Sequence, residues 1–157
     1  MDDDLVDREV ERLVAAHPAL FGGALPEAFS HLPPGWYNLV DRLCHALEER
    51  LGEQAWRRLQ VLQLKEKYGA LRFHYRFVAD EAPQRPSEPS LHVEKPRPSE
   101  ECRASVKALV GAATAESTVT CLRCGESGVL RNIDGYLTTL CTRHHTVAAG
   151  ASKAGSR

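Results

Sequence analysis

The sequence predicts an α+β protein in which helices pack on a small antiparallel sheet and a zinc ribbon forms the C-terminal end. Three observations predict this class. Apolar residues recur at helical spacing in three segments, apolar and polar residues alternate over residues 71–78, and two short pairs of metal-ligand residues lie near the end of the chain. A hydrophobic share of 43% in 157 residues is enough to form a folded core.

Helices are predicted where apolar side chains repeat every three or four residues. The first covers residues 5–16 and ends before Pro18, because the residue before a proline avoids the α region. The second covers residues 36–51 and the third residues 100–115. Within the second helix we place Cys44 at the edge of the core, as a structural thiol.

Residues 59–64 and 71–78 are predicted to form a β-hairpin with Gly69 at its turn. In the second strand one face is apolar and the other is basic. The apolar face is expected to be buried and the basic face to be exposed to solvent. The candidate partner-binding residues on and beside the turn are Lys65, Lys67, Tyr68, Arg72, His74 and Arg76. They form either a contact surface for an acidic partner or phosphate backbone, or a solvated face that keeps an edge strand from pairing.

The chain is expected to divide into four parts. Residues 1–78 form a domain of helices and the β-hairpin, and residues 79–99 form a linker. The linker holds five prolines, which disfavour both helix and sheet. Residues 100–146 form a helix and the ribbon, and residues 147–157 a flexible tail of mostly small residues.

Two ligand pairs with short internal spacing predict the metal site. Cys121 and Cys124 are separated by two residues, as are Cys141 and His144, and sixteen residues lie between the pairs. Two tight turns of this kind can bring four donors into a tetrahedron, which is the geometry of structural Zn²⁺. His145 is the alternative to His144 as the fourth ligand. Four protein ligands leave no position for substrate, so the predicted role of the zinc is structural.

The segment between the ligand pairs is predicted to form two short strands, residues 129–133 and 136–140. Asp134-Gly135 lies between them and is among the strongest short signals for a hairpin turn. Together with the ligand spacing, this predicts a zinc ribbon.

Two stretches of the sequence resemble catalytic motifs, but each lacks part of the motif. His92-Val93-Glu94 followed by Cys121-x2-Cys124 resembles the zinc deaminase pattern, but Thr120 stands where that pattern has a proline. The end of the ribbon resembles that of HNH nucleases, yet residues 125–140 hold no histidine to act as general base. An HNH-like nuclease is therefore only a remote alternative.

The remaining histidines occur singly along the chain. We interpret them as surface or capping residues rather than as parts of an assembled active site: His17, His31, His45, His74 and His92.

Three stretches together resemble a group of small bacterial and prophage-associated proteins of unassigned function: Pro34-Gly35-Trp36-Tyr37, the run from Lys65 to Phe73 (KEKYGALRF), and the Cys-x2-Cys-Gly…Cys-x2-His end. The resemblance covers most of residues 33–145, and KEK[YF]GxLRF is its most specific part. The resemblance implies that the protein is encoded among mobile-element or inter-bacterial conflict genes. It identifies no catalytic residue.

Charge is distributed unevenly. Residues 1–64 carry 11 acidic and 6 basic side chains, whereas residues 102–157 carry 3 acidic and 7 basic ones. We predict a non-enzymatic protein-binding inhibitor or accessory factor, of the toxin-immunity or prophage type. Its acidic helices at 2–16 and 41–53 would face a basic partner. The alternative is nucleic-acid binding through Arg72, Arg76, Arg123, Arg131 and Arg143.

The sequence also bears on the compartment and on other ligands. No apolar run reaches the roughly 18 residues that cross a membrane, and the acidic N-terminus lacks the pattern of a signal peptide. A cytoplasmic location without a membrane partner is therefore expected. No phosphate-binding or dinucleotide motif occurs, so no small-molecule substrate is predicted.

Overall fold

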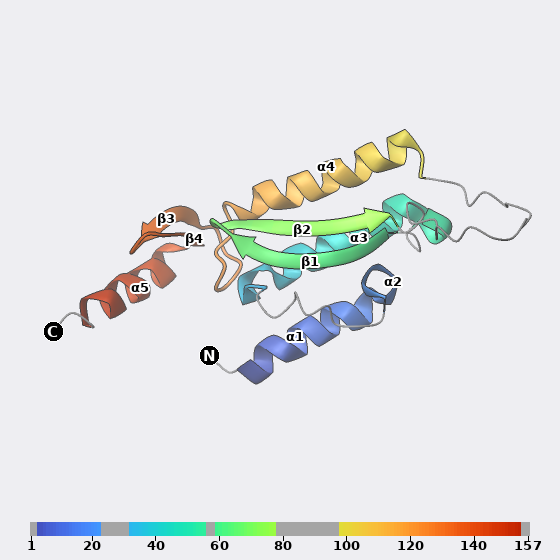
Figure 1. Cartoon of the computed structure of the whole chain (residues 1–157). Coiled ribbons are helices and arrows are strands. Elements are labelled where there is room, and N and C mark those ends of the chain that lie inside the picture. Colours follow the sequence, from blue (N-terminus) through green and yellow to red (C-terminus); the bar gives the residue numbers. More distant parts are fainter. Residues whose placement is uncertain (1–2, 23–31, 56–58, 78–97, 155–157) are drawn as a thin grey trace, which may run out of the picture.

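The computed structural model describes residues 3–22, 32–55, 59–77 and 98–154, the coloured parts of Figure 1. It confirms the α+β class, with helices around one antiparallel hairpin and a second small hairpin near the C-terminus. In chain order the elements are α1 (Asp3–Ala16), α2 (Pro18–Phe21), η2 (Pro34–Trp36), α3 (Tyr37–Ala55), β1 (Leu59–Lys67), β2 (Ala70–Phe77), α4 (Glu100–Ser117), β3 (Val129–Ile133), β4 (Tyr136–Leu140) and α5 (Thr142–Ala154).

The β1–β2 hairpin turns at Tyr68 and Gly69, as predicted. Both residues have positive φ, 57° and 75°, which is the backbone of a two-residue turn that matches the twist of paired strands. The carboxylate of Glu66 accepts a hydrogen bond of 2.6 Å from the amide of Gly69 and stabilises the turn. β1 continues to Lys67, three residues beyond the predicted end of that strand.

The main core is built between the hairpin and the long helices. α4 packs along β2 and against α3, and α3 passes behind the hairpin in Figure 1. The predicted inner face of β2 is confirmed for Leu71, Phe73 and Phe77, which are buried, while Tyr75 is half-buried at its margin. The same core cluster includes fully buried side chains from four other elements: Trp36, Leu47, Leu64 and Val106.

Two segments differ from their predicted structure. Residues 18–21 form the short helix α2, because Pro18 is suited to the first turn of a helix and only breaks α1. α5 runs through residues predicted as tail and ends at Ala154. The sequence pattern missed it because its residues are small rather than periodic in hydrophobicity. Most of the predicted linker, residues 79–97, lies outside the described residues, as do His31 and His92.

His17 corrects a further prediction. It was interpreted as a surface or capping residue, but its side chain is fully buried between the end of α1 and α3. Among the described residues, no helix has both the length and the apolar character needed to cross a lipid bilayer.

Cys44 and Cys102 are expected to differ in reactivity. Cys44 is fully buried, and that burial, with the nearby carboxylates of Glu48 and Asp41, raises the pKa of its thiol above the ordinary range. Cys102 is only partly buried, in the first turn of α4. Brief treatment of the folded protein with an alkylating reagent should modify Cys102 and spare Cys44, as measured by peptide mass spectrometry. Equal labelling of the two thiols would contradict the buried position of Cys44.

Candidate metal centre

The four predicted ligands meet in one group that could hold a metal ion: Cys121, Cys124, Cys141 and His144. Nδ1 of His144 lies 3.2 Å from Sγ of Cys141 and 3.5 Å from Sγ of Cys121. Sγ of Cys124 lies 3.8 Å from Sγ of Cys141. Metal–ligand bonds of about 2.0–2.3 Å at tetrahedral angles place neighbouring ligand atoms roughly 3.3–3.8 Å apart. The spacing therefore fits one central ion.

The structure places His144 in this group rather than His145. α5 begins at Thr142, so both histidines lie in its first turn and point in different directions around the helix axis. The amide of His145 donates to the carbonyl of Cys141, at 2.9 Å, which closes that first turn. The ligand spacing favoured His144 over His145, and the first turn of α5 places His144 in the group.

The first ligand pair is held by a tight turn that follows α4. Gly125 has φ of 77°, and its amide donates to the carbonyl of Cys121 at 2.8 Å. The amide of Cys121 in turn donates to the carbonyl of Glu126 at 2.7 Å. A glycine is needed after Cys124 because the left-handed backbone is strained for other residues.

The second pair is presented by the β3–β4 hairpin, whose strands have the predicted bounds. Its turn residues Asp134 and Gly135 both have positive φ, 51° and 90°, and the side chain of Asn132 accepts a hydrogen bond from the amide of Gly135. β4 then returns the chain to Cys121, so that Cys141 at its end lies beside the first pair.

The surroundings favour thiolate at Cys121. Burial by itself would raise the pKa of this thiol. Hydrogen bonds outweigh it and lower the pKa to about 6. They come from the backbone of Cys141, Arg123 and Cys124 and from the side chain of His144. Because the thiolate is the form that binds metal, this environment prepares Cys121 as a ligand.

Gly35 joins the metal-binding end, residues 119–146 (the ribbon), to the helical body. The amide of Gly35 donates to the carbonyl of Leu122 at 2.9 Å. A Cβ on Gly35 would lie 2.1 Å from the carbonyl oxygen of Cys121 and 2.8 Å from the amide nitrogen of Cys124. The neighbouring indole of Trp36 is fully buried and donates to the carbonyl of Thr120 at 3.1 Å.

The tip of the β1–β2 hairpin forms a second joint with the ribbon. The hydroxyl of Thr139 donates to the carbonyl of Gly69 at 3.1 Å, and a Cβ on Gly69 would lie 2.3 Å from Leu130. The hydroxyl of Ser117 accepts a hydrogen bond from the amide of Leu71 at 2.8 Å. Hence the Pro-Gly-Trp and KEKYGALRF stretches, far apart in sequence, both contact the ribbon.

The candidate partner-binding residues lie together on the outer side and tip of the β1–β2 hairpin. Lys65 is directly opposite Arg72 in the strand register, and His74 lies two residues further along the same face. Tyr68 is 64% exposed at the tip, with the Lys67 amine 5.2 Å from its ring. We call this set the hairpin face: Lys65, Lys67, Tyr68, Arg72, His74 and Arg76.

The ribbon arginines considered for nucleic-acid binding are less available. Arg143 forms an ion pair with Glu126, and its hydrogen bond to the sulfur of Cys124 raises the pKa of the guanidinium. Arg131 is half-buried, whereas Arg123 is exposed.

Sequence analysis missed a second group that could hold a metal ion: His17, His45 and Glu48. His45 and Glu48 lie on one face of α3, and that i, i+3 spacing is visible in the sequence. His17 comes from a different helix, and nothing in the sequence indicates that it reaches this face.

Comparison with protein-family models, with curated proteins and with solved structures found no match for the chain. What the protein does is therefore inferred from its own residues and their arrangement.

Proposed function

We propose that the Cys121, Cys124, Cys141 and His144 group holds Zn²⁺ in a structural role. Three thiolates and one imidazole form a donor set that Zn²⁺ prefers, and the separations among them suit its tetrahedral geometry. With four protein donors the coordination shell is closed. The ion then stabilises the ribbon and leaves no position for a catalytic water.

We propose further that the protein is a cytoplasmic, non-catalytic binding protein, an inhibitor or accessory factor that contacts an acidic protein partner through the hairpin face. The observation that carries this proposal is the strand register. It gathers the basic side chains of both strands on one outer side, with an exposed tyrosine at the end. Residues 59–77 contain four Lys and Arg against one Glu, and the carboxylate of that Glu is engaged by the turn.

The composition of the hairpin face resembles that of protein interfaces, in which tyrosine and arginine are enriched. Part of the acidic charge on the helices that sequence analysis assigned to a basic partner is engaged within the chain. In α3, Asp41 and Glu48 contact His17, and Arg50 forms an ion pair with Glu101 at 3.2 Å. The inhibitor or accessory role is also the one that the resemblance to prophage-associated proteins implies.

Nucleic-acid binding is the second candidate, because Lys65 and Arg72 could equally contact phosphates. One feature counts against it, because Arg143, which was considered for phosphate contact, forms an ion pair with Glu126. A phosphate-binding surface would show an affinity that falls by about one log unit per log unit of salt for each phosphate neutralised.

Charge reversal on the hairpin face tests the proposal. Affinity for the partner is expected to fall about tenfold or more in a Lys67→Glu/Arg72→Glu variant, because a like charge replaces an opposite one at each position. The measurement is capture of partner protein from host lysate, with and without nuclease treatment, followed by titration with the captured protein. Lys107→Glu is the matched control, since Lys107 is exposed on α4 outside the hairpin face.

The outcomes separate the two candidates. A stoichiometric protein retained by the wild type and by Lys107→Glu, and lost by the double variant, supports the proposal. If the double variant captures the protein as fully as the wild type does, the contact lies outside the hairpin face. Binding that disappears on nuclease treatment would instead support the nucleic-acid candidate.

A further inference from the structure

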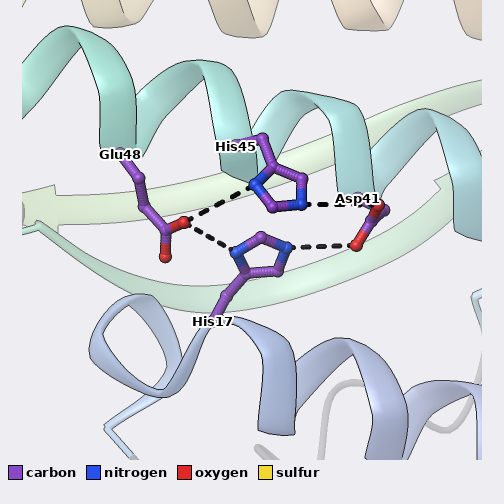
Figure 2. Close-up of polar contacts among 4 residues, drawn as sticks. All are labelled: His17, Asp41, His45 and Glu48. Carbon is purple, nitrogen blue, oxygen red and sulfur yellow. Dashed lines mark hydrogen bonds and ion pairs between the residues drawn. The ribbon is translucent and has the colours of Figure 1, made fainter.

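Four side chains outside the ribbon form a closed arrangement of imidazoles and carboxylates, the His17 cluster: His17, Asp41, His45 and Glu48 (Figure 2). Three of them project from α3, where Asp41, His45 and Glu48 are spaced at i, i+4 and i+7 and so share one face. The fourth, His17, reaches this face from the junction of α1 and α2.

The position of His17 is set by its backbone. Its amide donates to the carbonyl of Leu13 at 3.1 Å, which ends α1. Its carbonyl accepts hydrogen bonds from Leu20 at 3.1 Å and Phe21 at 3.3 Å, which begin α2. The side chain is fully buried and therefore has little rotational freedom, so its two ring nitrogens are aimed at fixed points.

Each imidazole has one nitrogen toward Glu48 and the other toward Asp41 (Figure 2). For His17 the distances are 2.9 Å from Nδ1 to Oε2 of Glu48 and 3.1 Å from Nε2 to Oδ1 of Asp41. For His45 they are 4.0 Å from Nδ1 to the same Glu48 oxygen and 3.8 Å from Nε2 to Oδ2 of Asp41. The two rings lie edge to face, with their centroids 4.6 Å apart.

A metal ion fits the Glu48 side of this arrangement. A neutral imidazole carries one N–H, so it can donate to only one of the two carboxylates that contact His17. The other ring nitrogen then presents a lone pair, and a metal ion is a group that this nitrogen and a carboxylate can both bind. A metal ion would use the Glu48 oxygen and the nitrogens of both His17 and His45.

We propose that His17, His45 and Glu48 bind one divalent first-row transition-metal ion, at a site separate from the ribbon. Their ligand atoms lie within 4.8 Å of one another. Two imidazoles and one carboxylate suit ions such as Zn²⁺, Co²⁺ or Fe²⁺, and three protein donors leave coordination positions for water. The side chain of His45 is 66% exposed, so an ion can enter from solvent.

Asp41 is a positioning residue for this site. Metal-bound histidines usually donate their second N–H to a carboxylate, which fixes the tautomer and the direction of the ring. Here one carboxylate faces Nε2 of both His17 and His45, so both Nδ1 atoms are directed to the Glu48 side. A bound ion would link the α1–α2 junction to α3.

The test uses the full chain with Zn²⁺ already bound in the ribbon and adds Co²⁺, followed by absorption and calorimetry. A further equivalent of Co²⁺ should bind without a sulfur-to-cobalt charge-transfer band, because no thiolate belongs to this site. His45→Ala or Glu48→Gln should weaken this binding at least a hundredfold and leave the ribbon Zn²⁺ in place. Asp41→Asn should weaken it about 10- to 100-fold. His74→Ala, at an exposed histidine on β2, is the matched control and should bind as the wild type does.

Two results would overturn the proposal. If no further equivalent of Co²⁺ binds, the His17 cluster is not a metal site. If both His45→Ala and Glu48→Gln still bind the further equivalent, the ion lies elsewhere. Glu48→Gln keeps the size of the side chain, so it serves even if His45→Ala folds poorly. The result is independent of partner capture, because the hairpin face contains none of these residues.

Discussion

Cys121→Ser is expected to unfold the ribbon while the helical body keeps its secondary structure. Among the described residues, the buried cluster of the ribbon consists of Cys121, Leu140 and Cys141, and the partly buried Leu122, Cys124, Ile133 and Ala148 pack against it. Two of the three buried residues, Cys121 and Cys141, are candidate metal ligands. So small a core cannot stabilise two short strands and their turns without the ion. Structural zinc contributes on the order of 10 kcal/mol to the folding of small modules. This is the largest single effect that we expect from a point substitution.

The measurement is amide exchange by mass spectrometry, which should show loss of protection over β3, β4 and α5. A chelator strong enough to remove Zn²⁺ should produce the same loss in the wild type, and restored Zn²⁺ should reverse it. Cys102→Ser is the matched control, because Cys102 lies outside the metal-binding group. Full protection of the ribbon in Cys121→Ser would contradict the structural role of the metal.

Gly35→Ala is expected to separate the ribbon from the helical body. The added methyl would lie 2.1 Å from the carbonyl oxygen of Cys121, 2.6 Å from the amide nitrogen of Gly125 and 2.8 Å from that of Cys124. All three atoms belong to the backbone and cannot move aside by rotating a side chain. The Gly35–Leu122 hydrogen bond and the position of two candidate metal ligands, Cys121 and Cys124, would both be disturbed. We expect a loss of about 3 kcal/mol in the free energy of unfolding.

Gly111→Ala is the matched control for this substitution. Gly111 lies within α4, and nothing approaches within 4 Å of the position where its Cβ would be. Alanine there should leave stability unchanged or raise it by up to about 1 kcal/mol, because alanine favours helix. The measurement is chemical denaturation of Gly35→Ala and Gly111→Ala, each with Zn²⁺ bound, which gives the free energy of unfolding of each variant. Equal stability of both variants would contradict the close contact between Gly35 and the ribbon.

The ribbon was predictable because its determinants are local. Ligand spacing, Asp134-Gly135 and Gly125 each specify a turn within a few residues, and the turns together set the strand register. The same holds for the β1–β2 hairpin, where alternation predicts which face is buried. α5 was not predicted, because its small side chains carry no periodic signal and its first turn depends on Cys141 and His144 meeting the other ligands.

The sequence by itself therefore determined the α+β class, the two hairpins and the four residues of the metal-binding group, all of which follow from short-range backbone preferences. Only the tertiary structure decided that Gly35 and Gly69 contact the ribbon, and that His17 is buried against Asp41 and Glu48. Contacts of this kind join residues that are 24 or more positions apart. They depend on how whole elements pack, which no local pattern records.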